Sequence, residues 1–302
     1  MEKSKNNPII TIGITAFNSG SFLKEALDSV LNQNNSQWKA VLILDGGANR
    51  ESRRIYDNFQ HPKFEKFKFE KNHGPFGTRN KAIEISSTEW YCHLDGDDLL
   101  PKSAVSDIIE TIKNNPNADY IFGDCEKFSK NNSFIRKPYS DYEMLCYSPL
   151  FNGQSPIKKD LYLKLGGYDS NMYINADWDF WISIYENGIH GAYTDTMIYR
   201  QRKRTNNVGH KNIQLRPEIV DIIIKKHPKY FCNHGRINNA KYHVYSMLAQ
   251  YYRSIGDRES SYKNAKIAMT FGKTKPVFES IFREKKMNFV RYMIRRLGRK
   301  IY

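Results

Sequence analysis

Short apolar runs alternate with amphipathic segments along the first 120 residues. The apolar runs are rich in β-branched and aromatic residues, as buried strands are, and lie at 8–15, 39–45, 64–72 and 90–95, the third being the weakest. Apolar positions recur with helical spacing at 21–33 and 76–86, where Ser21 is the expected N-cap of the first helix. This order predicts an α/β fold, a mostly parallel sheet flanked by crossover helices.

The polar residues between these segments gather where the predicted strands end. In an open parallel sheet, ligands bind at the carboxyl ends of the strands, so these loops are the expected functional site. The loops contain, in order, Thr15, Phe17 and Asn18, then Asp45 and Gly46, then Asn72, His73 and Gly74, and finally the run Asp95–Asp98.

The pattern becomes helical in the last third of the chain, which predicts two domains, 1–215 and 216–302. Residues 237–276 read as a helical hairpin that turns at Gly256 and Asp257, with a spacing similar to that of one tetratricopeptide repeat. One repeat cannot bury its own apolar face. It is therefore expected to pack on the first domain, on the terminal helix or on a second subunit of a homo-oligomer.

The segment 277–302 combines an apolar stripe with a basic composition. The stripe consists of Val290, Met293, Ile294, Leu297 and Ile301. Residues 273–302 include ten Lys and Arg residues and two Glu residues. A basic amphipathic helix of this kind is typical of an anchor on an anionic membrane surface, and equally of a helix that packs on its own protein and leaves its basic face in water.

Length, composition and charge limit the class of protein. With 302 residues, of which 40% are hydrophobic, the chain can bury a large core. The net charge of +15 favours partners that carry phosphate, such as nucleotides, nucleic acid or anionic lipid. The four cysteines are far apart and form no Cys-x-x-Cys pair, which predicts neither a zinc site nor a disulfide framework. The apolar runs are too short for a signal peptide or a membrane span, so a cytoplasmic protein is expected.

The sequence Asp-Gly-Asp-Asp at Asp95–Asp98 follows a predicted strand directly. Two carboxylates, Asp95 and Asp97, on one side of a tight turn suit a hard divalent cation that bridges a diphosphate. The alternative is that acidic residues and glycine are simply common in turns.

The loops resemble, in the same order, those of the inverting family 2 glycosyltransferases, which have the nucleotide-sugar-binding GT-A fold. The similarity covers about 9–204 and rests on the motifs TAFN, LILDGGANR, NHGPFGTRN and LDGDD. It implies that the nucleotide-diphosphate sugar is bound by Thr15, Phe17, Asn18, Asp45, Arg79, Asp95 and Arg202. It also implies a Mn²⁺ or Mg²⁺ ion, with Asp97 as its direct ligand and Asp95 near the ribose and the metal. His210 could complete this metal site, although a single histidine in a loop is more often a surface residue. This chain departs from the family pattern at Gly46, where a second Asp is usual.

A later segment, 161–188, resembles the Gly-Gly-Phe-Asp motif of the same family and the acidic helix start that follows it. The resemblance makes Asp177 the catalytic base, with Asp179 in a supporting role. The usual acidic neighbour of the base is replaced by Ala176. Judged from the residues alone, both aspartates could equally cap the helix or interact with its dipole.

The basic residues that follow the helix are further candidates. A strand is expected to end at Tyr199 and to lead into a loop that carries Arg200, Arg202 and Arg204. Guanidinium groups there could bind the diphosphate through paired hydrogen bonds, or could belong to a solvated basic loop. His93 lies within a predicted strand and is expected to be an interior residue.

The resemblance implies a metal-dependent inverting glycosyltransferase that moves a hexosyl or hexosaminyl group. The donor is expected to be a UDP-sugar, because Asp45 could accept a hydrogen bond from the uracil imide. A glycan or lipid-linked glycan in bacterial capsule or lipopolysaccharide synthesis is the expected acceptor, with the enzyme cytoplasmic or peripheral on the inner face of the membrane. One alternative is a non-catalytic relative that binds glycan or nucleotide. A basic nucleic-acid-binding protein is less favoured, because the basic residues gather mainly in the tail.

Overall fold

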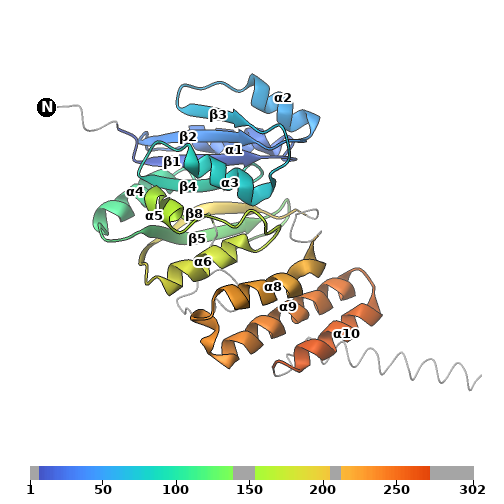
Figure 1. Cartoon of the computed structure of the whole chain (residues 1–302). Helices are drawn as coiled ribbons and strands as arrows, with labels where there is room; N and C mark the ends of the chain where they lie inside the picture. Colours follow the sequence, from blue (N-terminus) through green and yellow to red (C-terminus); the bar gives the residue numbers. More distant parts are fainter. Residues whose placement is uncertain (1–6, 139–153, 205–211, 273–302) are drawn as a thin grey trace, which may run out of the picture. The chain divides into compact units, whose positions relative to one another are not determined.

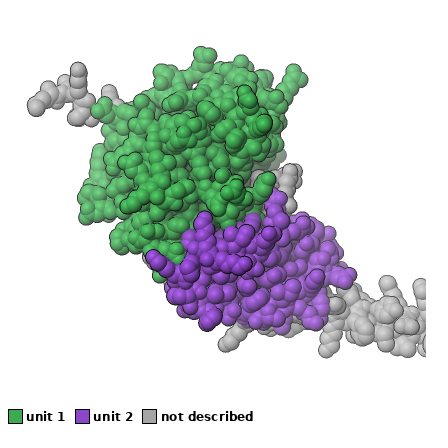
Figure 2. Space-filling model, viewed as in Figure 1, with its two compact units in different colours: residues 1–211 green, residues 212–302 purple. Residues whose placement is uncertain are grey.

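The computed structural model describes residues 7–138, 154–204 and 212–272. The chain forms two compact units, 1–211 and 212–302 (Figure 2). The first contains the sheet and the helices around it, and the second is helical (Figure 1).

The described part of the first unit is built on one eight-stranded sheet (Figure 1). The strands are β1 (Ile10–Ala16), β2 (Trp38–Leu44), β3 (Phe64–Lys68), β4 (Trp90–Asp95), β5 (Tyr120–Phe128), β6 (Ser133–Arg136), β7 (Ile157–Lys158) and β8 (Gly191–Arg202). They run in the order β3-β2-β1-β4-β7-β5-β6, and β8 pairs with β5. β1 to β4 are parallel to one another, as are β5 and β8, whereas β6 and β7 pair antiparallel with their neighbours.

Helices cover both faces of this sheet. They are α1 (Phe22–Leu31), α2 (Arg50–Asn58), α3 (Gly74–Glu84), α4 (Ala104–Asn114), α5 (Lys159–Lys164) and α6 (Ala176–Glu186). Figure 1 shows α3, α5 and α6 in front of the sheet, with α1 behind it. Successive strand residues point to opposite faces, and this alternation assigns the side chains of β4. Cys92 is buried in one cluster with Leu27 of α1 and Ile108 of α4. Tyr91 and His93 belong to the opposite face, which α3 covers.

The order of strands and helices up to β4 agrees with the sequence prediction, with one omission. The structure adds α2 between β2 and β3. This helix has the sequence RESRRIYDN and buries only Ser52 and Tyr56, so it carries little apolar periodicity. Its recognisable signal is the N-cap, where Asn49 Oδ1 accepts a hydrogen bond from Ser52 N at 2.8 Å.

The second unit contains three described α-helices: α8 (Arg216–Lys226), α9 (His234–Ser254) and α10 (Arg258–Met269), with 3-10 turns at Ile213–Leu215 and Tyr230–Cys232. α9 and α10 form the predicted hairpin, and Gly256, at φ +82°, lies between them. Small buried residues, Ala249, Ala265 and Ala268, allow the two helices to approach closely. In the part of the chain that the structure describes, no helix has the length and apolar character needed to cross a membrane. The basic segment 277–302 lies outside the described residues.

Candidate active site

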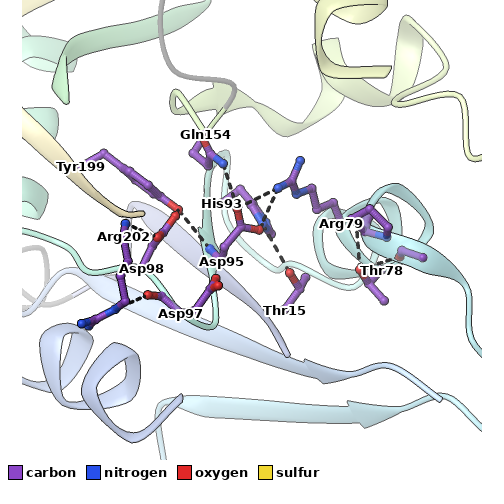
Figure 3. A network of polar contacts seen from close by, with 12 residues as sticks. Thr15, Thr78, Arg79, His93, Asp95, Asp97, Asp98, Gln154, Tyr199 and Arg202 are labelled. Atoms are coloured by element: carbon purple, nitrogen blue, oxygen red, sulfur yellow. Dashed lines mark hydrogen bonds and ion pairs between the residues drawn. The ribbon is translucent and has the colours of Figure 1, made fainter. Parts of the chain in front are cut away.

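Three carboxylates lie at the carboxyl edge of the sheet, Asp95 at the end of β4 and Asp97 and Asp98 in the turn that follows it (Figure 3). Gly96 at the centre of this turn packs against the end of β1, and its N–H donates to Thr15 O at 2.8 Å. A Cβ atom at this position would lie 2.8 Å from that same oxygen. The close approach therefore requires glycine, and it fixes Asp95 and Asp97 on either side of the β1 terminus.

Asp95 is held by three side chains. Arg79 Nη2 donates to both of its carboxylate oxygens, at 2.7 and 2.8 Å, and Gln154 Nε2 donates to Oδ2 at 3.0 Å. His93 Nε2 lies 2.9 Å from Oδ1. Burial alone would raise the pKa of Asp95, but the charge of Arg79 and the hydrogen bond from His93 outweigh it and hold this pKa well below its usual range. Asp95 is thus a fixed negative charge.

His93 remains neutral beside this carboxylate. Its side chain is buried on the α3 face of β4, and Tyr91 Oη lies 3.3 Å from Nδ1. Burial, reinforced by the positive charge of Arg79, lowers the pKa of His93 to about 4, although contact with Asp95 acts in the opposite direction. The 2.9 Å contact is therefore a hydrogen bond from a neutral imidazole, and Arg79 is the counter-ion of Asp95. The expectation that His93 is an interior residue is confirmed.

Asp97 and Asp98 differ in exposure. Asp98 is 3% exposed, and burial together with the charges of Asp95 and Asp97 raises its pKa. The Asp97 side chain is 27% exposed, and Arg204 Nη1 donates to its Oδ2 at 2.8 Å. Burial and the charge of Asp95 raise the pKa of Asp97, while Arg204 opposes this effect. Asp97 is accordingly more accessible than Asp98. Its exposure is close to the 25% of the Asp95 side chain, both of whose oxygens already accept hydrogen bonds.

β8 holds the carboxylate turn through Tyr199 and Arg202, which lie beside Asp98 in Figure 3. Tyr199 Oη donates to Asp98 Oδ2 at 2.8 Å and accepts from Asp95 N at 3.2 Å. Arg202 N donates to Asp98 Oδ1 at 2.7 Å, and Arg202 Nε donates to Asp97 O at 2.9 Å. The predicted strand end at Tyr199 is wrong, because β8 continues to Arg202 and pairs there with β5. Arg200 and Arg202 are therefore strand residues.

The arginines of this strand end have protein partners. Arg200 pairs with Glu126 on β5. Arg202 Nη2 donates to Glu25 at 2.7 Å, and its guanidinium lies over the ring of Phe22. Arg204 contacts Asp97 and also donates to Asn18 O at 3.2 Å.

Arg79 links the carboxylate turn to the start of α6. Burial works against its charge, but Asp95, with smaller contributions from Tyr168 and Asp177, raises the pKa of Arg79 further. Asp177 is therefore close enough for its charge to act on Arg79. Arg79 Nε lacks a hydrogen-bond partner among the described residues. It lines a cavity of about 10 Å³, room for about one water molecule, together with residues that include His93 and Tyr168.

Asp177 occupies the first turn of α6. The preceding Asn175 has a left-handed backbone, with φ 67°, and this conformation directs the chain into the helix. Asp177 is partly exposed, and its Oδ1 accepts from Trp178 N at 3.0 Å, whereas Asp179 is only 2% exposed. Ala176 is completely buried, so a carboxylate at this position would have to be desolvated. Packing thus accounts for the absence of the usual acidic neighbour.

Asp45 follows β2 and organises the start of α3. Its Oδ1 accepts from His73 N at 2.8 Å and its Oδ2 from Gly74 N at 3.0 Å. The side chain is 4% exposed. A Cβ atom on the adjacent Gly46 would lie 2.2 Å from the carbonyl carbon of Lys71, so no side chain fits there while this loop keeps its conformation. The substitution of the usual Asp by Gly46 therefore has a steric reason.

The residues after β1 face the same edge. Thr15 Oγ1 lies 3.4 Å from His93 Nε2. Phe17 is 38% exposed. Asn18 Oδ1 accepts from Asn49 N at 2.9 Å, which ties this loop to α2. The predicted donor-binding residues of β1, α3 and β4 thus lie along one edge of the sheet.

Asp97 is the carboxylate best placed to bind a divalent cation. The Asp95 carboxylate already accepts from Arg79, His93 and Gln154, and Asp98 is buried. The described residues contain no group of three His, Cys, Asp or Glu side chains that could enclose a metal. One carboxylate nevertheless suits Mg²⁺ or Mn²⁺ when phosphate oxygens and water supply the remaining ligands. His210, the predicted additional ligand, lies outside the described residues.

Two members of the site were not anticipated from the sequence. Gln154 hydrogen-bonds to Asp95 from 59 positions away, and Tyr199 reaches the turn across 104 positions. Gln154 has no sequence signal. Tyr199 does have one, because a tyrosine near the end of an apolar strand is well suited to place its hydroxyl at the sheet edge.

A comparison with protein families gives a match to Glycosyl transferase family 2 over residues 11–178. Among curated proteins, the chain is 23% identical over 246 residues to an uncharacterised glycosyltransferase of Methanocaldococcus jannaschii, covering 76% of this chain and 83% of the relative. It is 26% identical over 213 residues to the GalNAc(5)-diNAcBac-PP-undecaprenol beta-1,3-glucosyltransferase of Campylobacter jejuni, covering 64% of this chain and 66% of the relative.

Solved structures share the fold. The Staphylococcus aureus protein TarS, residues 1–349, in complex with UDP-GlcNAc, superposes with a TM-score of 0.64 at 13% identity, covering 87% of this chain and 81% of that one. The mannosyltransferase PcManGT of Pyrobaculum calidifontis, in complex with GDP-Man and Mn²⁺, gives a TM-score of 0.57 at 15% identity, covering 94% of this chain and 81% of that one. The predicted α/β GT-A fold with a helical C-terminal region is thus confirmed.

Proposed function

Because the chain belongs to glycosyltransferase family 2, we propose that it transfers a hexosyl or hexosaminyl group, with inversion, from a nucleotide-diphosphate sugar to a hydroxyl group. The observation that carries this proposal is the network of Arg79, Asp95 and Asp97 at the carboxyl edge of one sheet, with the charge of Asp177 acting on Arg79. Such an edge is where α/β folds bind nucleotides.

Asp177 is the proposed base. An inverting transfer needs a group that takes the proton of the acceptor hydroxyl as its oxygen attacks the anomeric carbon. A partly exposed carboxylate in the first turn of α6 can do this, whereas the buried Asp179 cannot reach a substrate. No covalent sugar–enzyme intermediate is needed, because the displacement takes place in one step.

The donor is proposed to lie over the ends of β1 and β4. Phe17 offers an exposed ring to the nucleobase, and Asn18 and Thr15 border the same loop. Asp45 and Arg79 are buried, so we propose that they support the donor site by holding the start of α3 and the Asp95 carboxylate in place. A divalent cation on Asp97 would neutralise charge on the departing diphosphate. Asp95 contributes by holding Arg79 and the turn in place rather than by direct ligation.

The names of the relatives and of the solved neighbours suggest the classes of donor and acceptor. A UDP-sugar is our first choice, and GDP-sugars are the alternative, because one solved neighbour is described with UDP-GlcNAc and another with GDP-Man and Mn²⁺. The name of the Campylobacter jejuni relative includes an undecaprenol-linked acceptor. We accordingly propose a glycan or lipid-linked glycan acceptor in capsule or lipopolysaccharide synthesis.

The base assignment is tested with Asp177→Asn. This change keeps the size and much of the hydrogen bonding but removes the proton acceptor, so metal-dependent hydrolysis of the donor should fall by about 100-fold or more. Thermal stabilisation by donor and Mn²⁺ should persist, since the variant still binds the nucleotide. A panel of UDP-, GDP- and dTDP-sugars identifies the donor in the same assay.

Asp160→Asn is the matched control, because Asp160 is also an acidic residue in the first turn of a helix but belongs to α5. It should hydrolyse donor at the wild-type rate. Near wild-type hydrolysis by Asp177→Asn would show that Asp177 is not the base. A wild-type protein that binds donors but hydrolyses none would favour the non-catalytic relative.

A further inference from the structure

Asp97, the carboxylate best placed to bind a divalent cation, is already paired with a positive charge. Arg204 Nη1 donates to Asp97 Oδ2 at 2.8 Å, and Arg204 Nη2 donates to Asn18 O at 3.2 Å. Among the described residues, Arg204 is the one side chain that hydrogen-bonds to the Asp97 carboxylate. The guanidinium thus occupies one of the two oxygens through which Asp97 could bind a divalent cation.

Arg204 is held less firmly than its neighbour Arg202. The Arg202 side chain is 14% exposed, lies over the rings of Phe22 and Phe128, and hydrogen-bonds to Glu25 and to the backbone of Asp97. The Arg204 side chain is 33% exposed, and its guanidinium is 5.6 Å from the ring of Phe22. A partly exposed ion pair of this kind contributes little stability, so it can be exchanged at low cost. Arg202 is part of the framework, and Arg204 is replaceable.

The charge balance of the turn explains why a cation stands there. Asp95 has Arg79 as its counter-ion. Asp97 lies two residues from Asp95, and the negative charge of Asp95 makes an unpaired negative charge on Asp97 unfavourable. The turn therefore needs a positive partner for Asp97 whether or not a nucleotide is bound.

We propose that Arg204 is a stand-in cation, which holds Asp97 in the resting protein and gives up this carboxylate when a divalent cation arrives together with the diphosphate. This inference rests on the proposed function, since it assumes that the site takes a nucleoside diphosphate. A guanidinium and a metal ion repel each other when both lie against the same carboxylate. A free metal ion that binds through Oδ2, alone or together with Oδ1, therefore displaces Arg204 and leaves it without an anion.

A metal ion that arrives with a diphosphate avoids this cost, because the diphosphate supplies new acceptors for the displaced guanidinium. The binding of metal and the binding of nucleotide are thereby coupled, and each strengthens the other by the same factor. Arg204 is thus a positioning residue that makes the site accept metal and nucleotide as a unit.

The test measures Mn²⁺ binding to the full-length protein by calorimetry, alone and in the presence of UDP or GDP. In Arg204→Gln, Mn²⁺ alone should bind about threefold to fivefold more tightly than in wild type, as expected from the loss of one partly exposed competing ion pair. The strengthening of Mn²⁺ binding by nucleotide should become smaller. Arg204→Lys keeps the positive charge but loses the paired hydrogen bonds of the guanidinium group. Its affinity for Mn²⁺ alone should lie between those of wild type and Arg204→Gln.

Lys203→Gln is the matched control. It removes the same charge one residue away, where Lys203 Nζ lies over the Phe134 ring at 4.3 Å. Its affinity for Mn²⁺ alone should equal that of wild type. An equal gain in Mn²⁺ affinity in Lys203→Gln and Arg204→Gln would show that the net charge near the site controls the affinity, and would overturn the proposal. Unchanged or weaker Mn²⁺ binding in Arg204→Gln would overturn it as well. If wild type binds neither UDP nor GDP, the proposed function fails, while the comparison with Mn²⁺ alone still decides the role of Arg204.

Discussion

A neutral histidine at the centre of the site makes its stability depend on pH. The pKa of His93 is about 4 in the folded protein because of burial and the charge of Arg79, against an ordinary value of 6.5. The unfolded chain therefore takes up a proton first as the pH falls. This contribution to stability is fully present above pH 6.5 and is lost as the pH falls toward about 4.

We predict that the free energy of unfolding of wild type falls by about 3 kcal/mol more than that of His93→Gln between neutral pH and about pH 4. Glutamine can donate to Asp95 as His93 does, but it does not titrate. Chemical denaturation at several pH values measures the difference. His61→Gln, a change at the histidine stacked on Trp38, is the control, and its free energy of unfolding should depend on pH as that of wild type does. Identical slopes for wild type and His93→Gln would contradict the assignment.

At the scale of elements, β8 determines the shape of the carboxylate turn although it is remote in sequence. The Tyr199 hydroxyl is buried and serves both Asp98 and the backbone of Asp95. Its removal leaves a buried carboxylate and a backbone N–H each short of one hydrogen bond.

Tyr199→Phe should therefore lower the free energy of unfolding by about 2 kcal/mol and weaken nucleotide binding in the presence of Mn²⁺, because Asp97 is held less firmly. Tyr193→Phe is the control on the same strand. Tyr193 Oη donates to Asp124 at 2.6 Å, but the side chain is 37% exposed, so water can replace the lost bond. Denaturation and calorimetry give both quantities. Equal losses of nucleotide binding in the two variants would argue against a specific role of Tyr199.

At the scale of the whole molecule, the two compact units divide the chemistry. The unit 1–211 carries the described candidate site, and α9 and α10 of the second unit share a small core built on alanines. The basic segment 277–302 is still the candidate for an anionic membrane surface. Several basic residues, each contributing about 1 kcal/mol, could hold the protein there reversibly.

A chain that ends before Val277 should lose sedimentation with vesicles rich in phosphatidylserine while it keeps donor hydrolysis. Full-length protein should bind these vesicles less at high salt, because screening weakens the attraction. Vesicles of phosphatidylcholine alone provide the uncharged control. Full-length protein that stays in solution with anionic vesicles at low salt would instead favour packing of the segment on its own protein.

The sequence alone predicted the parts that depend on local pattern. The strands β1, β2 and β4 are buried on both faces, so each is a continuous apolar run. The parallel order then placed the loops after them, with Asp45, Asp95 and Asp97, at one edge of the sheet. α2 was missed because its helix is almost entirely polar and stabilised by its cap.

The tertiary structure decided which of these residues are available to a ligand. The local pattern Asp-x-Asp does not distinguish Asp95 from Asp97, and only the family resemblance favoured Asp97 as the direct ligand. In the structure, Arg79 and Gln154 hydrogen-bond to Asp95, whereas Arg204 alone among the described side chains hydrogen-bonds to the carboxylate of Asp97. These partners come from separate segments that meet only when the sheet forms. Pattern in the sequence reports local periodicity, whereas the burial and pairing of a charge depend on contacts between distant segments.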